Sequence, residues 1–276
     1  MAQKKRRLFC EMSPLFFALS TQKEVIKRKF QDLRSEAVFA GQRQEGRLPN
    51  VVSKQNLPLI KRAKGIDIRL QENKAVNIRL ACSAITGIVI HPGELFSFWR
   101  MVGKTTPEKG YKDGRILRYG HLQPGIGGGL CNLSNVIHRL VLHSPLEVVE
   151  FHSHSDALAP DHGERIPFSS GTSVSYNYID YRFRNNTDQD VQLLVWCDEE
   201  TLYGELRSEY QFPQFFELVE ENHHFHKEGD KYYRVSQIYK RAVDRQTGET
   251  TQMQLVLDNH SEVMFDYQLI PKESIR

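Results

Sequence analysis

Cys131 follows three consecutive glycines and enters a segment whose apolar residues are spaced as on one face of a helix. The apolar members are Leu133, Val136, Ile137, Leu140 and Val141. A helix with one buried stripe has this spacing. Cys131 would open that helix, where unpaired N–H groups and the helix dipole stabilise a thiolate and lower the thiol pKa below its usual ~8.5. A reactive thiol is one interpretation, and a structural cysteine after a tight glycine turn is the other.

A cysteine nucleophile needs a base to take its proton and a third group to orient that base. We expect His154, at the end of a predicted strand, to be the base, and Asp180, on the next strand, to be the orienting group. Sequential elements usually pack as neighbours, so the three residues would converge at one end of a sheet. His152 lies two residues away on the same strand face and is the alternative base. The competing interpretation is that both histidines are surface or supporting residues.

Further residues around the thiol are candidates for substrate binding or oxyanion stabilisation. Glycines permit a close approach to the sulfur, and side-chain amides and hydroxyls supply donors for an oxyanion. The predicted set is Gly128, Gly129, Asn132, Ser134, Trp99, His152 and Tyr178. The polar members would otherwise cap the helix, and the aromatic cluster around Trp99 would otherwise belong to the core.

We predict neither a metal nor a cofactor. His152, His154 and Asp156 have a spacing that invites a metal site, but no nearby residue completes it convincingly. A second histidine cluster, residues 223–226, is interpreted as an exposed turn. Residues 109–114 do not match a phosphate-binding loop, so no nucleotide is expected.

Composition indicates a globular protein of 276 residues with 39% hydrophobic residues and a formal net charge of +3. The basic start, Lys4 to Arg7, belongs to no recognisable nucleic-acid-binding motif, and no nucleic-acid partner is expected. The four cysteines form no Cys-x-x-Cys pair, which favours a reducing compartment over zinc or disulfides. No apolar run approaches the ~20 residues of a membrane span. We therefore expect a cytoplasmic protein, with peripheral membrane association left open and the oligomeric state unknown.

The hydrophobic patterns predict an α+β fold in which the cysteine-bearing helix packs on an antiparallel sheet. Helices are expected at 20–39, as an amphipathic packing helix, and at 74–84. Strands are expected at 85–90, 115–119, 146–152, 172–183, 191–197, 201–207, 232–242 and 252–257. The predicted division is an N-terminal helical extension at 1–56, a core at 57–208 and a β-rich C-terminal extension at 209–276, packed on the core.

Several motifs together resemble the VanW family, named from type-B vancomycin resistance clusters. They are Pro92–Trp99, Val102–Gly103, Lys109–Tyr111, Gly127–Asn135, Val149–Glu150 with His152, His154 and Ser155, Pro167–Phe168, Tyr176–Tyr178 and Asp180–Asn185. Looser similarity extends from about Leu57 to Tyr267. Asn132 departs from the glutamine that the family usually has after the cysteine, which puts the role of this side chain in doubt.

The resemblance implies a bacterial protein associated with the cell envelope or glycopeptide resistance, and it does not supply a reaction. The order of cysteine on a helix, histidine on a strand and aspartate on the next is also similar to a transglutaminase or papain-type core, by fold-level analogy. The leading hypothesis is a Cys131–His154–Asp180 hydrolase or acyl transferase acting on a cell-wall precursor or another peptide-like small molecule. The alternative is a non-catalytic module that binds such a precursor or a partner protein.

Overall fold

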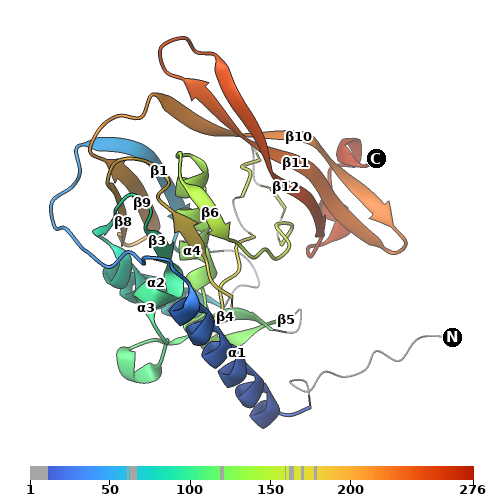
Figure 1. Ribbon diagram of the computed structural model, residues 1–276. Coiled ribbons are helices and arrows are strands. Elements are labelled where there is room, and N and C mark those ends of the chain that lie inside the picture. The colour runs from blue at the N-terminus through green and yellow to red at the C-terminus, as the bar shows by residue number, and fades with distance from the viewer. Residues whose placement is uncertain are drawn as a thin grey trace.

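The computed structural model describes residues 12–60, 62, 67–118, 121–158, 160–161, 165–168, 171–176 and 179–276 (Figure 1). The α-helices of this part are α1 (Pro14–Arg34), α2 (Ile68–Ile85), α3 (Phe98–Val102) and α4 (Leu130–Leu142). They combine with several antiparallel sheets, which confirms the predicted α+β class.

The core is built around a four-stranded antiparallel sheet with α2 and α4 packed against it. The strands, in spatial order, are β1 (Asn50–Pro58), β9 (Thr201–Ser208), β8 (Val191–Cys197) and β2 (Ile88–Ile90). The apolar face of α4 is fully buried at Leu133, Ile137 and Leu140. Gly204 of β9 allows α4 to approach closely, since a Cβ there would lie 2.8 Å from Leu140 and 2.9 Å from Val136. The cysteine-bearing helix therefore packs on an antiparallel sheet, as predicted.

Two smaller β units complete the core. A three-stranded sheet has the order β3 (Leu95–Ser97), β7 (Arg182–Arg184) and β6 (Glu147–Glu150). A hairpin joins β4 (Asp113–Arg118) to β5 (His121–Ile126) and leads through the glycine turn into α4. Because β1 pairs with β9 along its length, it crosses the predicted boundary at 56/57, and the division into domains stays a prediction.

A long three-stranded antiparallel sheet forms the C-terminal part and lies above the core in Figure 1. Its strands are β10 (Gln214–Glu228), β11 (Lys231–Asp244) and β12 (Thr250–Glu262). The predicted turn at the histidine cluster 223–226 is wrong, because these residues lie within β10. The strand register shifts between Glu221 and His224, and Asn222 has a φ of 54°. A β-bulge thus interrupts the strand without reversing it.

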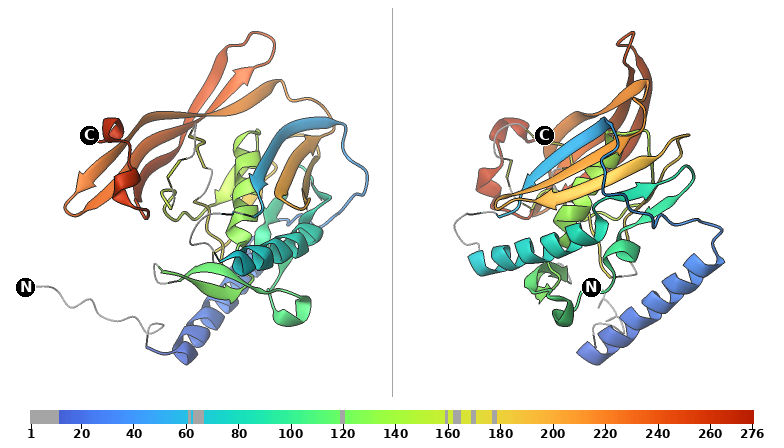
Figure 2. Two further views of the ribbon diagram at one scale, coloured as in Figure 1. Left: turned by 180° about the vertical axis from the view of Figure 1, so that it is seen from behind. Right: turned by 90° about the vertical axis from the view of Figure 1, so that its left-hand side faces the viewer.

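Helix α1 has the amphipathic pattern that the sequence indicates. The prediction that it packs through its apolar face is wrong, because that face is exposed. It lies along the outside of the core, as both views of Figure 2 show. Two ion pairs hold it there, Arg28 with Glu150 and Asp32 with Arg182. Most of its large apolar side chains are exposed, including Leu33 at 81% and Leu15 at 66%. The helix is therefore anchored through its polar face.

Candidate functional site

The glycine turn before Cys131 is shaped by close backbone packing. Gly129 caps α4 in the left-handed conformation, with φ at 99°, and no side chain caps this helix end. A Cβ on Gly128 would lie 2.2 Å from the carbonyl carbon of Gly114, and one on Gly129 would lie 2.1 Å from Cγ of Lys74. The glycines therefore let the turn fit between β4 and α2, which is a structural need separate from substrate access.

Asn77 of α2 fixes the position of the turn. Its side-chain amide donates 2.9 Å hydrogen bonds to the carbonyl oxygens of Gly128 and Lys112. Its carbonyl oxygen accepts a 2.8 Å bond from the Lys112 N–H. Asn77 is completely buried, so these bonds are shielded from water. They orient the start of α4, and with it the Cys131 side chain.

The Cys131 thiol is covered by another part of the chain. Its Sγ lies 3.8 Å from the Val174 carbonyl oxygen, to which it donates a hydrogen bond. Burial raises the thiol pKa, and backbone hydrogen bonds at Val174 and Cys131 oppose that rise only in part. The expected fall in pKa is therefore wrong for this conformation, because the loss of water around the sulfur outweighs the backbone hydrogen bonds that favour a thiolate. The thiol is held in its neutral form.

The polar face of α4 organises what we call the cover segment, Phe168 with residues 171–176. Asn135 donates a 2.7 Å bond to the Phe168 carbonyl oxygen and accepts a 2.7 Å bond from the Thr172 hydroxyl. Through these bonds, and one from the Thr172 N–H to the same amide oxygen, α4 holds the Phe168 carbonyl and Thr172. The described part of the predicted strand 172–183 has only single bridges before β7 begins at Arg182.

Sequence reasoning missed His138, which lies two turns after Cys131 on α4. Its ring stacks on Phe151 with centroids 4.3 Å apart, and its Nδ1 lies 3.2 Å from the Tyr181 hydroxyl oxygen. Within the described part of the chain, Nε2 has no hydrogen-bond partner, and neither does the buried hydroxyl of Ser134 one turn earlier. The i, i+4, i+7 spacing of Cys131, Asn135 and His138 was the available signal.

His138 gives the fold a specific pH dependence. Burial, with a contribution from the charge of Lys240, lowers the pKa of His138 to about 3. Only the unfolded chain then takes up this proton as the pH falls from about 6.5 towards 3, so acidification destabilises the fold by up to about 1.4 kcal/mol per pH unit. The effect is absent above pH 6.5. Urea unfolding at pH 6.5 and 4.5 should show a shallower loss of stability in His138→Phe than in the wild type. Equal losses of stability in the two proteins would contradict this role of His138.

His154 and Asp180 belong to different networks in this structure. The Nδ1 of His154 lies 2.8 Å from the Ser155 carbonyl oxygen. Asp180 is 1% exposed and accepts bonds from the Ser97 hydroxyl at 2.5 Å and from Arg182 Nε at 2.8 Å. Among the hydrogen bonds of the described residues, none joins Cys131, His154 and Asp180 to one another. Their catalytic roles stay a prediction.

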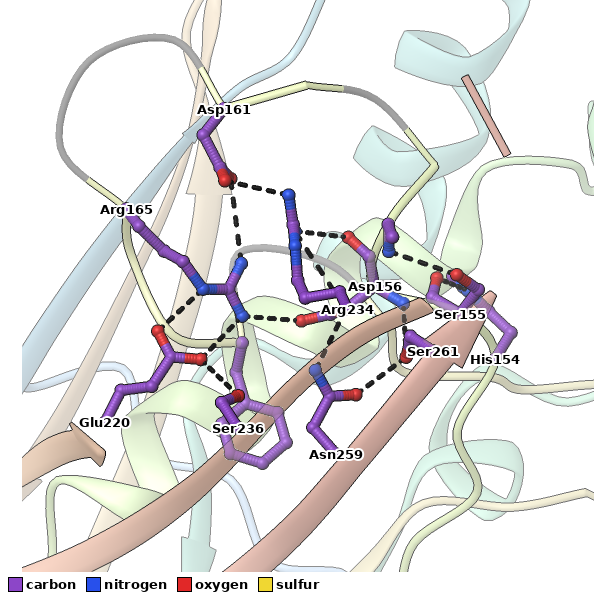
Figure 3. Close-up of polar contacts among 12 residues, drawn as sticks. His154, Ser155, Asp156, Asp161, Arg165, Glu220, Arg234, Ser236, Asn259 and Ser261 are labelled. Atoms are coloured by element: carbon purple, nitrogen blue, oxygen red, sulfur yellow. Dashed lines mark hydrogen bonds and ion pairs between the residues drawn. The ribbon is translucent and has the colours of Figure 1, made fainter. Parts of the chain in front are cut away.

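Figure 3 places His154 beside a buried cluster, the polar junction, where residues 154–156, 161 and 165 meet the C-terminal sheet. Its charged members are Asp156, Asp161, Arg165, Glu220 and Arg234. Arg165 binds both carboxylate oxygens of Glu220, at 2.6 and 2.8 Å. Arg234 is 1% exposed and pairs with Asp161 at 2.8 Å. The junction holds the C-terminal sheet to the core, so the neighbourhood of His154 is structural in this conformation.

The remaining predicted residues are dispersed. Trp99 is buried, with its indole N–H bonded to the Ile179 carbonyl oxygen. His152 is partly exposed and lies 2.9 Å from Glu150, which also binds Arg28. Asn132 is in the first turn of α4, where its backbone N–H donates to the Gly129 carbonyl. Tyr178 lies outside the described residues. In the described part, no three His, Cys, Asp or Glu side chains are grouped as metal ligands.

An open groove of about 430 Å³ lies across β1, β8 and β9, beside the second half of α4. Its lining residues are Lys54, Gln55, Asn56, Arg139, Ile166, Trp196, Tyr203, Gly204 and Glu205. Trp196 and Tyr203 stack nearly parallel, with centroids 5.4 Å apart. Arg47 lies over the Trp196 ring at 5.4 Å. The groove therefore has an aromatic wall, which sequence reasoning did not identify.

Charged groups of both signs meet at this groove. Glu205 is only 6% exposed and pairs with Lys54 at 3.1 Å and Arg207 at 2.9 Å. Its pKa is lowered, because these cations outweigh the opposing effect of burial. Arg139 has a buried Nε without a hydrogen-bond partner among the described residues, and burial lowers its pKa. An aromatic wall beside fixed charges suits a ligand with both ring faces and ionic groups.

Residues 73–207, which contain the glycine turn, α4 and most of the groove, match the family described as "VanW like protein". This region belongs to that family, which confirms the resemblance indicated by the motifs. The chain is 28% identical over 221 residues to the vancomycin B-type resistance protein VanW of Enterococcus faecalis, and the match covers 80% of each chain. It is also 33% identical over 120 residues to the uncharacterized protein YoaR of Bacillus subtilis, covering 44% of this chain and 38% of that protein. No solved structure gives a significant match.

Proposed function

We propose that the VanW-like region is a binding module that takes a sugar-peptide fragment of a cell-wall precursor in the groove. The observation that carries this proposal is the 430 Å³ groove, where the Trp196–Tyr203 stack adjoins Lys54 and Glu205. Aromatic faces pack against sugar rings or apolar side chains, while the charges bind the carboxylate and amino groups of a peptide. The printed name of the Enterococcus relative, a vancomycin resistance protein, supports the choice of ligand class.

Calorimetric titration with N-acetylmuramyl-pentapeptide tests the groove. Trp196→Ala is expected to weaken binding about tenfold, because an aromatic contact contributes about 1.4 kcal/mol at the upper end of its usual range. Tyr210→Ala is the control, since Tyr210 is 71% exposed and outside the groove lining. Cys131→Ala should bind as the wild type does. No measurable binding by the wild type, or binding lost in Cys131→Ala but kept in Trp196→Ala, would overturn the proposal.

A second candidate is a cysteine-dependent hydrolase or acyl transferase acting on an amide of the same ligand class. The observation in its favour is that Cys131 lies in the first turn of α4, at a helix end that no side chain caps, where backbone N–H groups favour an anion. Cys131 would be the nucleophile, His154 the base and Asp180 the orienting group, in a transglutaminase- or papain-like arrangement. That arrangement requires the cover segment to leave the thiol and Asp180 to exchange its present partners.

Alkylation by iodoacetamide, followed by peptide mass spectrometry, separates the two candidates. With its raised pKa, Cys131 should label more slowly at pH 7 than in the urea-unfolded chain, and its rate should be unchanged in His154→Ala. Cys197 should label faster than Cys131, because a hydrogen bond with Cys82 lowers the Cys197 pKa. Rapid labelling of Cys131 that depends on His154 would instead favour the enzyme.

We also propose that the protein is cytoplasmic. A soluble precursor as ligand is consistent with that placement.

A further inference from the structure

Helix α1 is attached to the core through one face only. Arg28 donates to both carboxylate oxygens of Glu150, at 2.6 and 2.7 Å. Asp32, one turn later, accepts from both terminal nitrogens of Arg182, at 2.7 and 3.0 Å. Val25 lies on the same face and is buried. These i, i+3 and i+7 positions form the docking face of the helix.

The opposite face of α1 presents an exposed row of large apolar side chains, the apolar stripe. Its members are Leu15, Leu19, Ile26, Phe30 and Leu33, each 52–81% exposed. With 3.6 residues per turn, they fall within about 60° of the helix circumference. Figure 2 shows α1 running along the outside of the body. A continuous exposed stripe of this kind marks an interaction surface, whereas single exposed apolar residues need no explanation.

The net positive charge of the sequence is concentrated in its first 35 residues, which include this helix. Residues 1–35 contain nine Lys or Arg and three Asp or Glu, whereas the remaining residues contain 28 and 31. The segment thus has a net charge of +6 and the rest −3. Lys23 and Lys29 fall on either border of the stripe by helical spacing. Long cationic side chains at the borders of an apolar stripe are typical of helices that lie in a membrane interface.

We propose that α1 binds the surface of an anionic lipid bilayer, with the apolar stripe among the acyl chains and Lys23 and Lys29 at the headgroups. A second copy of the chain is a poorer occupant, because pairing two such stripes would bring the flanking lysines of both copies together. An interfacial position also fits the length and composition of the helices. No helix in the described part is long and apolar enough to cross a bilayer.

Co-flotation of the full chain with vesicles tests the proposal. We expect binding to vesicles of phosphatidylcholine with 30% phosphatidylglycerol, and at least tenfold weaker binding to phosphatidylcholine alone, since each basic residue near an anionic surface contributes about 1 kcal/mol. Lys23→Gln with Lys29→Gln should weaken binding to the anionic vesicles about tenfold or more. Raising the salt to 0.5 M should also release the protein.

The stripe itself is tested with Leu19→Gln, Ile26→Gln and Phe30→Gln combined, which should abolish flotation. The matched control replaces three similarly exposed apolar residues of the C-terminal part by Gln, namely Met253, Leu255 and Met264, at 45–48% exposure. It should float like the wild type. The proposal is overturned if the stripe variant still floats or if the control loses flotation equally. It is also overturned if the protein binds phosphatidylcholine vesicles as tightly as the anionic vesicles. It is also overturned if light scattering shows a lipid-free dimer that the stripe variant converts to monomer.

Discussion

Asp180→Ala is expected to destabilise the fold by about 3–5 kcal/mol, the range for removing one partner of a buried ion pair. The carboxylate accepts bonds from the Ser97 hydroxyl, the backbone N–H groups of Trp99 and Tyr181, and Arg182. All of these donors would lose a buried acceptor. The charge of Arg182 would then be neutralised by Asp32 and Glu150 alone. Urea unfolding followed by circular dichroism measures the change.

Asp258→Ala is the matched control, since Asp258 is exposed and its side chain accepts a bond from Gln237. Its stability should stay within about 0.5 kcal/mol of the wild type. If Asp180 served only to orient a catalytic histidine, its removal would leave the free energy of unfolding near that of the wild type. A change below about 1 kcal/mol would therefore contradict the structural role that we assign to its carboxylate.

Gly128→Ala is expected to cost about 3 kcal/mol or more, at the upper end of overpacking effects. The new Cβ would lie 2.2 Å from the Gly114 carbonyl carbon, and backbone has no alternative rotamer with which to give way. Displacing the turn should also loosen the start of α4, so Cys131 should be alkylated faster than in the wild type. Urea unfolding and the labelling rate at pH 7 measure the two effects.

Gly41→Ala is the control for this substitution. A Cβ on Gly41 meets no atom within 4 Å, and Gly41 is not among the residues with positive φ. Its stability should change by no more than about 0.5 kcal/mol. Wild-type stability in Gly128→Ala, combined with weaker ligand binding, would favour the sequence-based interpretation in which the glycines make room for a substrate.

The sequence was sufficient for the elements that bury one regular apolar stripe. The predicted strand 191–197 coincides with β8, and the helix beginning near Cys131 is α4. Periodicity succeeds there because the buried face is also the apolar face. It failed for β1, which is half polar and depends on pairing with β9, far away in the sequence. It failed also for the packing of α1, where Arg28 and Asp32 find buried partners more than 100 residues away.

The candidate site was predictable only as a set of residue types. Cys131 at a helix start follows from local pattern, but its raised pKa comes from burial of the sulfur, which lies next to Val174 in the fold. Asn135 makes that possible by bonding Phe168 and Thr172, and nothing in the local sequence specifies those partners. The groove likewise combines Lys54 of β1 with Trp196 and Glu205, which become neighbours only when the sheet is assembled.

The pairing of β1 with β9 has a consequence for synthesis on the ribosome. Asn50 lies opposite Ser208 in the sheet, so β1 leaves the exit tunnel long before its partner exists. Until then, the inner faces of α2 and α4 have no sheet to cover them, and the emerging chain exposes the surface that later becomes its core. Chains with such delayed, non-local pairing fold slowly and aggregate readily. The VanW-like region would therefore be open to aggregation until β9 has emerged, and a truncation that ends before β9 would leave β1 without its strand partner.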